Sequence, residues 1–569
     1  MTKPSLVIIE AFGKKDRVLS LFSQVNIPSF VFATLGNILD LPSHEFAIDS
    51  RLMKFENRVP VRDDIYNKIK ALDLNDYDQV YIATDNDVVG ESIARDFIEI
   101  TGAKDFIRIR MNDLNLSSLK ESLKKRETTL NQKLINEADA RRISDRIIGY
   151  YGDHNNRKKS ISFGRVATPL LNIAAKSDPI VKTITHRVFS GRDPIPYELK
   201  VSVKKSLAHL SSIIEKKLGN LTKNNFNFKE TTYERTAVPV SKPCSTSAIL
   251  VRVAGIYDED IKKIMASLQR NYENGDCSYI RTDSNRLSLD DSSEVAAICQ
   301  KNDFLIKMED LANKWFYPTE GEVSHHQHTH PAITPKTSRI MTTYDVNSDL
   351  SDKINTELYE SAKNSVLDCI YNSRVDEMLI GNIDDALLDL LARAECQPVW
   401  KRSFLTKDTG VSLDVIVSDG GRDLKIMSQQ NAKTYYSNAP EIEVKSLPRE
   451  RILLSLLTDS KIGKPSTYIH HCLKLKKHFG EDFNSRPSLF NSISFAESSV
   501  PKLLDASVAK VISDILADEK LDVYNKVSES LKAIGISSET LDLASSNEAK
   551  SGIEIDRERR TSSDSEFDF

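Results

Sequence analysis

Residues 5–115 alternate between short apolar runs and helical patterns, and this alternation constrains the fold more than any other feature of the sequence. The apolar runs are "SLVIIE", "SFVFATLG", "QVYIAT" and "FIRIRM". Strands that alternate with helices form a parallel sheet with helices on its faces. Ligands of such sheets bind where the strands end. We therefore expect a Rossmann-like α/β domain over residues 1–128, with its site at the carboxyl edge of the sheet.

The rest of the chain divides into helical and strand-rich segments. Short alternating runs such as "PYELKVSVKK" and "VSLDVIVSDG" lie on either side of a long helical stretch. A chain of 569 residues is long enough for about three to five domains. We predict a helical segment 129–190, a β-rich segment 191–240, a helical segment 241–375, a second β-rich segment 376–447, a second helical segment 448–544 and a disordered polar tail 545–569.

The composition argues against several classes of protein. No apolar run approaches the roughly 20 residues that span a bilayer, and the start "MTKPSLVIIEAFGKK" has too short an apolar run for a signal peptide. Six cysteines lie far apart without a C-x-x-C pair, which argues against a zinc ribbon or a disulfide framework. With a net charge of −4, any nucleic-acid site must be a local basic surface. We expect a cytoplasmic protein without a membrane anchor.

Four acids are expected at the carboxyl edge of the predicted sheet. Glu10 ends the first strand, and Asp85, Asp87 and Glu91 follow the strand near residue 82, with Gly90 permitting a tight turn. An isolated Asp-x-Asp most often caps the next helix. Crowded carboxylates, however, raise each other's pKa unless a cation lies among them, and Mg²⁺ prefers oxygen ligands. The full set of acids therefore favours a magnesium site.

This arrangement resembles the Toprim domain of topoisomerases, primases and some nucleases. The family pattern is a glutamate at the end of the first strand and D-x-D-x-x-G-E after a later one, as in "TDNDVVGE" here. The resemblance implies metal-assisted chemistry on phosphates and does not choose among those activities. Lys14 would add a positive charge near the phosphate, although a lysine at this position is by itself typical of a solvated surface.

The segment "CSYIRTDSNRLS" places a phenol, a guanidinium and a carboxylate at alternate positions. In an extended chain the side chains of Tyr279, Arg281 and Asp283 point to the same face. A tyrosine nucleophile, with a pKa near 10, needs a neighbouring cation to stabilise its phenolate. Arg281 could do this while it binds a phosphate, and Asp283 could hold Arg281. The alternative is a strand end with a surface salt pair.

Nine motifs in a fixed order resemble those of type IA DNA topoisomerases, over about residues 5–540. Around "SYIRTDSNRLS", which is similar to the family's Y-x-R-T-D-S signature, the other matching segments are "LVIIEAFGKKDRVLSLF", "FATLGNILDLP", "YIATDNDVVGESIA", "RMNDLN", "EADARRISDRIIGYYG", "SFGRVATPLL", "HTHPAITP" and "KIGKPSTYIHHCLKLKK". The chain resembles the shorter topoisomerase III-like arrangement, without the cysteine-rich zinc modules of many relatives.

The resemblance implies a fold, a reaction and a set of site residues. The fold is a torus of four domains. Tyr279 would attack a DNA phosphodiester and become linked to the 5′ phosphate, Arg281 and His330 would bind that phosphate, and Glu10 would act as general acid with Lys14 nearby. Asp85, Asp87, Glu91 and Glu10 would hold Mg²⁺. The residues that would contact or orient single-stranded DNA are Arg141, Asp145, Ser162, Arg165, Lys464 and Ser466.

Several positions depart from the family pattern. They are Asn37 for a histidine, Val88 and Val89 for Arg-Glu, Ala167 for a glutamine, Thr334 for an arginine and Lys464 for an arginine. A lysine lacks the planar fork with which arginine binds a phosphate. We expect these changes to alter the grip on the DNA strand or the metal dependence while the reaction is retained.

Other functions stay open at this point. A Toprim nuclease or primase-like enzyme would leave Tyr279 without a role as nucleophile, and a noncatalytic scaffold would bind single strands without cutting them. The histidines of "SHHQHTHP" could ligate a metal, but they lack cysteines or acids at ligand spacing, so we expect only His330 to be functional. We expect a monomer. We also expect that the protein uses no nucleotide, because no G-x-x-x-x-G-K-[ST] loop is present.

Overall fold

The computed structural model describes most of the chain. The described residues are 3–43, 45–49, 53–111, 114–154, 161–189, 196–221, 227–237, 242–287, 292–303, 331–336, 349–370, 373–406, 416–419, 422–425 and 440–536. The predicted tail 545–569 and the predicted phosphate ligand His330 lie outside them. Among the described residues, no helix has both the length and the apolar character to cross a bilayer.

The N-terminal unit contains a parallel sheet whose described strands follow the order β2–β1–β7–β8. All five residues of β1 (Ser5–Ile9) are buried, as expected of a parallel strand that is covered on both faces. The other strands are β2 (Ser29–Ala33), β7 (Val80–Ile82) and β8 (Ile107–Arg108), and the helices are α1 (Lys15–Gln24), α2 (Asp63–Lys70), α3 (Val88–Thr101) and α4 (Leu116–Lys125). The predicted α/β domain is therefore confirmed.

An insertion between β2 and α2 joins this unit to the next one. It contains two antiparallel pairs, β3 (Leu39–Asp40) with β6 (Val59–Pro60) and β4 (Ile48–Asp49) with β5 (Lys54–Phe55). The buried side chains of this insertion, Phe46 among them, share a hydrophobic cluster with helices from both ends of the chain. The helices α5 (Gln132–His154), α17 (Ala506–Ala517) and α18 (Val523–Ile534) of this cluster belong to a second, helical unit. The other helices of this unit are α6 (Ala167–Lys176), α14 (Arg449–Asp459), α15 (Tyr468–Leu475) and α16 (Pro487–Ser499).

The third unit is an antiparallel sheet whose described strands follow the order β11–β12–β13–β10–β9–β16. They are β9 (Ile180–Val188), β10 (Tyr197–Lys204), β11 (Asn227–Ala237), β12 (Ser373–Asn382), β13 (Val399–Thr406) and β16 (Glu441–Ser446), with α7 (Ser211–Gly219), α13 (Asp385–Arg393) and the pair β14 (Ile416–Asp419) and β15 (Arg422–Lys425) nearby. Trp400 is the largest buried side chain of its core. The sheet begins at β9, before the segment boundary expected at residue 190.

The fourth unit carries the tyrosine segment. Its described helices are α8 (Thr246–Tyr257), α9 (Ile261–Asn274), α10 (Ser292–Lys301) and α12 (Leu350–Ile370). Single β-bridges, Cys244 to Ile333 and Cys277 to Pro335, hold the connecting segments beside one another. The tyrosine segment follows α9 directly, after a turn at Gly275 whose φ is +78°, a conformation that favours glycine.

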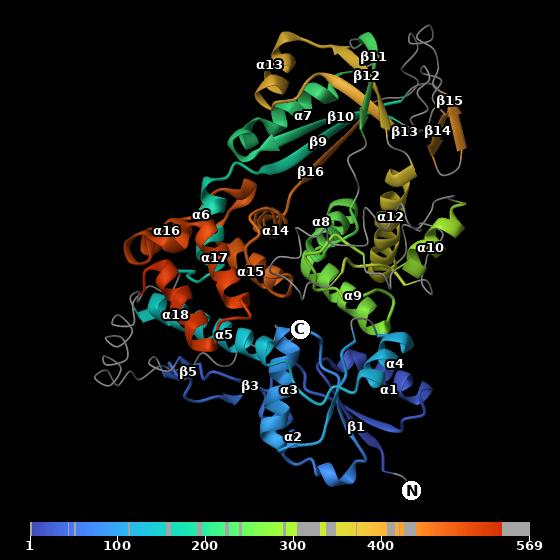
Figure 1. Cartoon of the computed structure of the whole chain (residues 1–569). Coiled ribbons are helices and arrows are strands. Elements are labelled where there is room, and N and C mark those ends of the chain that lie inside the picture. The colour runs from blue at the N-terminus through green and yellow to red at the C-terminus, as the bar shows by residue number, and fades with distance from the viewer. Residues whose placement is uncertain are drawn as a thin grey trace.

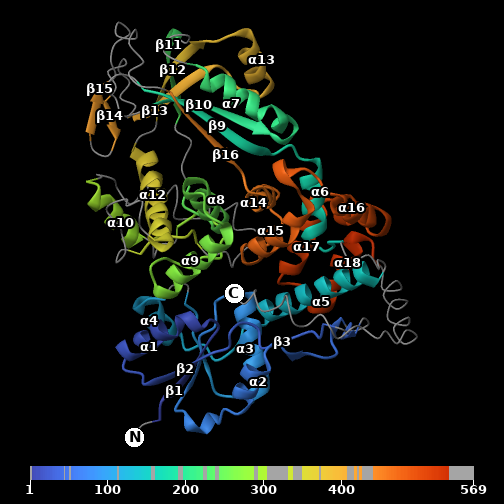
Figure 2. The ribbon, with the colours of Figure 1, turned by 180° about the vertical axis from the view of Figure 1, so that it is seen from behind.

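Figures 1 and 2 show the four units placed around a ring, with the α/β unit opposite the antiparallel sheet. One hydrophobic cluster includes buried side chains of the α/β unit, of α8 and α9, and of α14 and α15. The units that meet around the tyrosine segment therefore share a core. This arrangement agrees with the predicted four-domain fold.

Candidate active site

The acidic edge of the sheet is built by β1 and β7, which are neighbours. Glu10 follows β1 directly, and Asp85 and Asp87 lie in the loop between β7 and α3. Asp87 caps α3, because its Oδ1 accepts a hydrogen bond from the Gly90 amide at 2.8 Å. A Cβ at Gly90 would lie 2.1 Å from the Asp85 carbonyl oxygen, so this tight loop requires a glycine. The loop brings the acids together, and capping is one of the functions of Asp87.

Glu10 is a buried acid with one unsatisfied oxygen. Its Oε2 has no hydrogen-bond partner among the described residues, and its Oε1 lies 3.9 Å from the guanidinium of Arg281. Burial, and then the negative charge of Asp85, raise the pKa of Glu10 to about 7. A carboxyl group with this pKa holds a proton at neutral pH for a substantial part of the time, which suits a general acid.

Tyr279 meets the acids across the boundary between two units. Its hydroxyl donates a hydrogen bond to Asp87 Oδ2 at 2.9 Å, although the two residues are 192 positions apart in sequence. Burial, followed by the charges of Asp87 and Asp85, holds the pKa of Tyr279 well above its usual value, while Arg281 opposes this shift. The phenol is therefore protonated in this arrangement, and it needs both an acceptor for its proton and a cation beside its oxygen to react.

Arg281 supplies that cation. Although burial lowers the pKa of Arg281, the neighbouring Tyr279, Glu10 and Asp85 together raise it above its usual range. The guanidinium thus stays charged beside the phenol and the acids. It also forms the ion pair with Glu10 described above, so Arg281 connects Tyr279, the predicted nucleophile, to Glu10, the predicted general acid.

The segment from Tyr279 to Asp283 is not part of a strand, so the alternative of a strand end is not observed. The Oγ1 of Thr246 donates a hydrogen bond to the Ile280 carbonyl oxygen at 2.5 Å and accepts one from the Thr282 amide at 2.9 Å. The Thr246 amide donates to the Thr282 carbonyl oxygen at 2.9 Å, so these backbone groups are satisfied without a neighbouring strand. Asp283 accepts a hydrogen bond from the Tyr468 hydroxyl of α15 at 2.9 Å. This contact ties the tyrosine segment to the second helical unit, and it was not predicted.

Lys14 is buried rather than solvated. It forms an ion pair with Asp85, and its Nζ lies 4.9 Å from the centre of the Tyr272 ring. Of the two readings of this lysine, the structure therefore favours the one in which it is part of the site. Tyr272, whose ring packs edge-to-face on that of Tyr279, was missed by sequence reasoning. Its position seven residues before Tyr279, at the end of an amphipathic helix, was the only signal.

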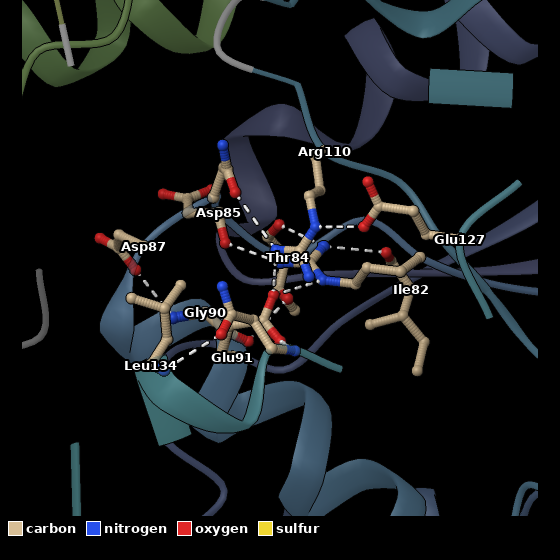
Figure 3. Close-up of polar contacts among 12 residues, drawn as sticks. Ile82, Thr84, Asp85, Asp87, Gly90, Glu91, Arg110, Glu127 and Leu134 are labelled. Atoms are coloured by element: carbon tan, nitrogen blue, oxygen red, sulfur yellow. Dashed lines mark hydrogen bonds and ion pairs between the residues drawn. The ribbon is translucent and has the colours of Figure 1, made fainter. Parts of the chain in front are cut away.

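Glu91 has different partners from those of a magnesium ligand. Its side chain is fully buried; its Oε1 accepts a hydrogen bond from Arg108 Nε at 2.9 Å and one from Arg110, and its Oε2 accepts one from the Asn131 amide at 3.0 Å. Figure 3 shows Arg110 between Glu91 and Glu127. Glu91 is thus fully buried between two arginines and a backbone amide, unlike Asp85 and Asp87 in the loop before α3. Its position indicates a structural partner of the arginines rather than a metal ligand.

Arg108 explains why Glu91 is held there. It is fully buried on β8 and donates hydrogen bonds to the carbonyl oxygens of Ile82, Thr84 and Asp85 at 3.0, 2.9 and 2.9 Å. Such a buried cation needs a carboxylate partner. The sequence signal was a pair of arginines at alternate positions of an apolar strand.

The remaining acids fit a divalent cation in part. No three His, Cys, Asp or Glu side chains in the described part of the chain are grouped as a ready metal site. Asp85 and Asp87 nevertheless lie on one loop beside the unsatisfied Glu10 oxygen, and repulsion from both aspartates contributes to the raised pKa of Glu10. Magnesium takes one or two carboxylates together with water and phosphate oxygens. The donor set is thus suited to an ion that binds together with a phosphate.

The predicted DNA-binding residues are brought together beside the tyrosine segment. Arg165 donates two hydrogen bonds to Asp145 at 2.9 and 3.1 Å, and Arg141 pairs with Glu137. Burial and then the neighbouring Arg141 lower the pKa of Lys464, which also feels the charges of Asp283 and Arg165. Ser466 is exposed on the same turn as Lys464. These groups form a basic surface next to the site.

Ser162 is hydrogen-bonded to His478, a residue that the sequence did not indicate as part of the site. His478 Nε2 lies 2.9 Å from the Ser162 hydroxyl, and its Nδ1 lies 3.0 Å from that of Ser488. The Ser162 amide donates a hydrogen bond to Ser492 at 3.1 Å. Ser162 therefore positions the turn that leads to Arg165, and nothing in its local sequence indicated the partner at position 478.

Comparison with known proteins identifies the family. A family model described as DNA topoisomerase matches residues 129–479, more than half of the chain, and a Toprim domain model matches residues 5–114. The chain belongs to the type IA DNA topoisomerase family. Its members that are similar in sequence include "DNA topoisomerase 1 type prokaryotic" of Acanthamoeba polyphaga mimivirus, which is 21% identical over 62% of this chain and 43% of the viral protein.

Two bacterial proteins extend this comparison. DNA topoisomerase 1 of Buchnera aphidicola is 25% identical over 73% of this chain and 48% of its own length, and that of Campylobacter jejuni is 23% identical over 82% and 68%. The chain spans about half the length of the first of these topoisomerases. The structure of full-length topoisomerase I from Thermotoga maritima superposes with a TM-score of 0.56, at 21% identity, over 93% of this chain and 89% of that one. The two proteins share a fold.

Proposed function

We propose that this topoisomerase-family protein cuts one DNA strand through a tyrosine linkage to the 5′ phosphate, passes another strand through the break and reseals it. The reaction uses Mg²⁺. It needs no nucleotide, because a phosphotyrosine bond conserves the energy of the phosphodiester that it replaces. Single-stranded regions of DNA are the substrate. The reaction would relax negative supercoils or decatenate DNA.

The observation that carries this proposal is the hydrogen bond from Tyr279 to Asp87. A tyrosine from a helical unit lies in contact with the acids of a Toprim sheet, beside an arginine that pairs with Glu10. A Toprim nuclease or primase would have no use for a buried phenol at this point. The contact therefore favours the topoisomerase reaction over those alternatives.

In the cleavage step the Tyr279 oxygen attacks the phosphorus atom of the scissile phosphodiester. The phenol proton leaves along the hydrogen bond to Asp87, and Arg281 stabilises the charge on the phenolate and on the phosphate. As the bond from phosphorus to oxygen forms, the bond to the 3′ oxygen breaks, and Glu10 gives its proton to that oxygen. Religation is the same exchange in reverse, so no atom or electron is gained or lost.

Magnesium would be held by Asp85 and Asp87. When bound, it supplies positive charge to a phosphate oxygen and orients the strand. Lys14, which pairs with Asp85, contributes a fixed positive charge at the same edge of the site. Glu10, with its raised pKa and its contact with Arg281, is assigned to proton transfer.

The DNA strand would reach this site over the basic surface. Beyond the effect of burial, Arg165 lies close enough to Arg141 and Lys464 to lower the pKa of both, and Arg141 lowers that of Lys464. Asp145 fixes the orientation of Arg165. Phosphate contacts of this kind position a strand without reading its sequence. These contacts would bind the strand that ends in the 3′ oxygen while Tyr279 is linked to the 5′ phosphate of the other end.

The test is a plasmid assay in Mg²⁺ without nucleotide. We expect the protein to convert negatively supercoiled plasmid into relaxed closed circles, and we expect EDTA or the substitution Tyr279→Phe to abolish this conversion. The exposed Tyr524, changed in Tyr524→Phe, serves as a matched control that keeps the activity. Nicked or linear DNA without relaxed closed circles would instead identify a nuclease.

A further inference from the structure

The C-terminal end of α9 lies against the corner where the Toprim sheet leads into α1. Residues 272–275 lie at the end of this helix and in the turn after it, two to five positions before the segment that contains the nucleophile. Three separate contacts join this end of α9 to residues 13–17 of the α/β unit, and each can be followed at the level of atoms.

The first contact is made by Tyr272. Its ring is buried; it packs edge-to-face on Tyr279 with centres 5.4 Å apart, and the ammonium group of Lys14 lies 4.9 Å from its centre. Lys14 in turn pairs with Asp85. One aromatic side chain therefore contacts the nucleophile on one side and a cation of the Toprim unit on the other, and such contacts stabilise a fixed ring orientation.

The second contact is made by Glu273. A Cβ placed on Gly13 would lie 1.9 Å from Glu273 Oε2 and 2.5 Å from its carboxyl carbon, so the carboxyl group packs directly on the backbone of the 3₁₀ turn Phe12–Lys14. Gln269, one helical turn earlier, donates a hydrogen bond to Glu273 Oε1 at 3.0 Å and fixes the side chain. The close approach works because position 13 has no side chain.

The third contact is made by the turn at Gly275. A Cβ at this residue would lie 3.2 Å from Nε of Arg17, and that nitrogen donates a hydrogen bond to the Leu114 carbonyl oxygen at 2.9 Å. The turn thus packs on a side chain that is itself held by the α/β unit. Together the three contacts fix where the chain leaves α9.

We propose that residues 272–275 are a docking element that sets the position of the nucleophile over the Toprim acids, with Tyr272 as the positioning residue and Glu273 on Gly13 as the interlock. This inference rests on the proposed function and adds to it. It explains how a tyrosine from one unit returns to hydrogen-bond distance of Asp87 each time the ring closes. A misplacement of about 1 Å at a reacting centre can cost roughly 100-fold in rate.

The interlock can be tested by a reciprocal pair of substitutions. Gly13→Ala places a methyl group where the Glu273 carboxylate lies. Because the carboxylate is the end of a flexible side chain and can move away from the added methyl group, we expect single-turnover cleavage of a single-stranded oligonucleotide to slow by about 3- to 10-fold. Glu273→Ala removes the obstruction and should restore most of the rate in the double variant. Gly480→Ala is the matched control, because φ there is −92° and the nearest atom to an added Cβ is 3.7 Å away.

The positioning function of Tyr272 is tested by comparing Tyr272→Phe with Tyr272→Ala. Phenylalanine keeps the ring and should cleave within about threefold of the wild-type rate, whereas alanine should lose about 10- to 100-fold. Oligonucleotide affinity, measured separately, should change little in both variants. Equal rates for the alanine variant and the wild-type protein, or no rescue of Gly13→Ala by Glu273→Ala, would overturn the proposal.

Hydrogen exchange separates this proposal from the proposed function. Amides of residues 277–283 should exchange faster in Gly13→Ala and Tyr272→Ala, and Glu273→Ala should reverse the effect of Gly13→Ala. If the wild-type protein forms no covalent DNA adduct but the variants show this exchange pattern, the proposed reaction is refuted and the docking element is retained. An adduct-forming wild type with unchanged exchange in both variants would refute the docking element alone.

Discussion

At the scale of single residues, the site combines groups whose burial would be unfavourable for each of them alone. Tyr279 donates to Asp87, Arg281 pairs with Glu10, and Lys14 pairs with Asp85. Each charge is compensated by a partner from another segment of the chain. The spacing of these residues in the sequence predicted that they belong to the site. It could not predict which group pairs with which, because the pairing depends on how two units meet.

The first prediction concerns the proton carried by Glu10. Glu10→Gln keeps the shape of the side chain and cannot give a proton to the leaving 3′ oxygen, so we expect cleavage to slow by about 10²- to 10⁴-fold while binding of single-stranded DNA is retained. Glu121→Gln, which changes an exposed carboxylate on α4, is the matched control. An unchanged cleavage rate in Glu10→Gln would exclude Glu10 as the acid.

The same residue predicts a pH dependence. A general acid acts in its protonated form, so a pKa near 7 means that wild-type cleavage is fast below pH 7 and slows as the pH rises through this value. The Glu10→Gln variant has no such group and should lose this limb of the profile. Rates of single-turnover cleavage between about pH 5.5 and 9 measure the effect. A wild-type rate that rises through pH 7 would contradict the assignment.

At the scale of elements, the parallel sheet could be predicted because β1 and β7 are continuous apolar runs that end in acids. The start of the antiparallel sheet at β9 could not, because β9 follows a helix directly and its buried positions do not alternate strictly. For the tyrosine segment, the residue spacing predicts an extended chain, with a strand end as the alternative. The segment is not part of a strand, and hydrogen bonds between Thr246 and residues 280 and 282 take the place of those of a sheet.

Glu91 shows the same limit within one element. Its place in the D-x-D-x-x-G-E pattern implied a metal ligand, yet the helix α3 directs it to Arg108 and Arg110. A motif read along the chain does not reveal a buried cation that arrives from the neighbouring strand. The function of this residue therefore needed the tertiary structure.

The second prediction follows from that pairing. Glu91→Gln leaves the buried Arg108 guanidinium without its carboxylate, which we expect to destabilise the protein by about 3–5 kcal/mol and to lower the temperature of unfolding. The Mg²⁺ concentration needed for half-maximal cleavage should stay close to that of the wild type, whereas Asp85→Asn should raise it. If Glu91→Gln unfolds at the wild-type temperature but needs more Mg²⁺ for cleavage, Glu91 is a metal ligand instead.

At the scale of the whole molecule, the four units surround the site as a ring (Figure 1). The shared hydrophobic cluster, the docking element of α9 and the hydrogen bond from Tyr468 to Asp283 hold the tyrosine segment between the Toprim unit and α15. The proposed strand passage would require these contacts to open and to form again. Because burial of apolar surface favours the closed arrangement, opening is the step that must be driven.

The proposed reaction depends above all on Tyr279 as the nucleophile. The most direct measurement is to trap the protein on a single-stranded oligonucleotide in Mg²⁺, denature it, digest it with trypsin and locate the attached nucleotide by mass spectrometry. The expected peptide, residues 271–281, contains both Tyr272 and Tyr279, so fragmentation must assign the site. We predict a 5′ phosphate on Tyr279. Attachment to any other residue, or cleavage without attachment, would contradict this account.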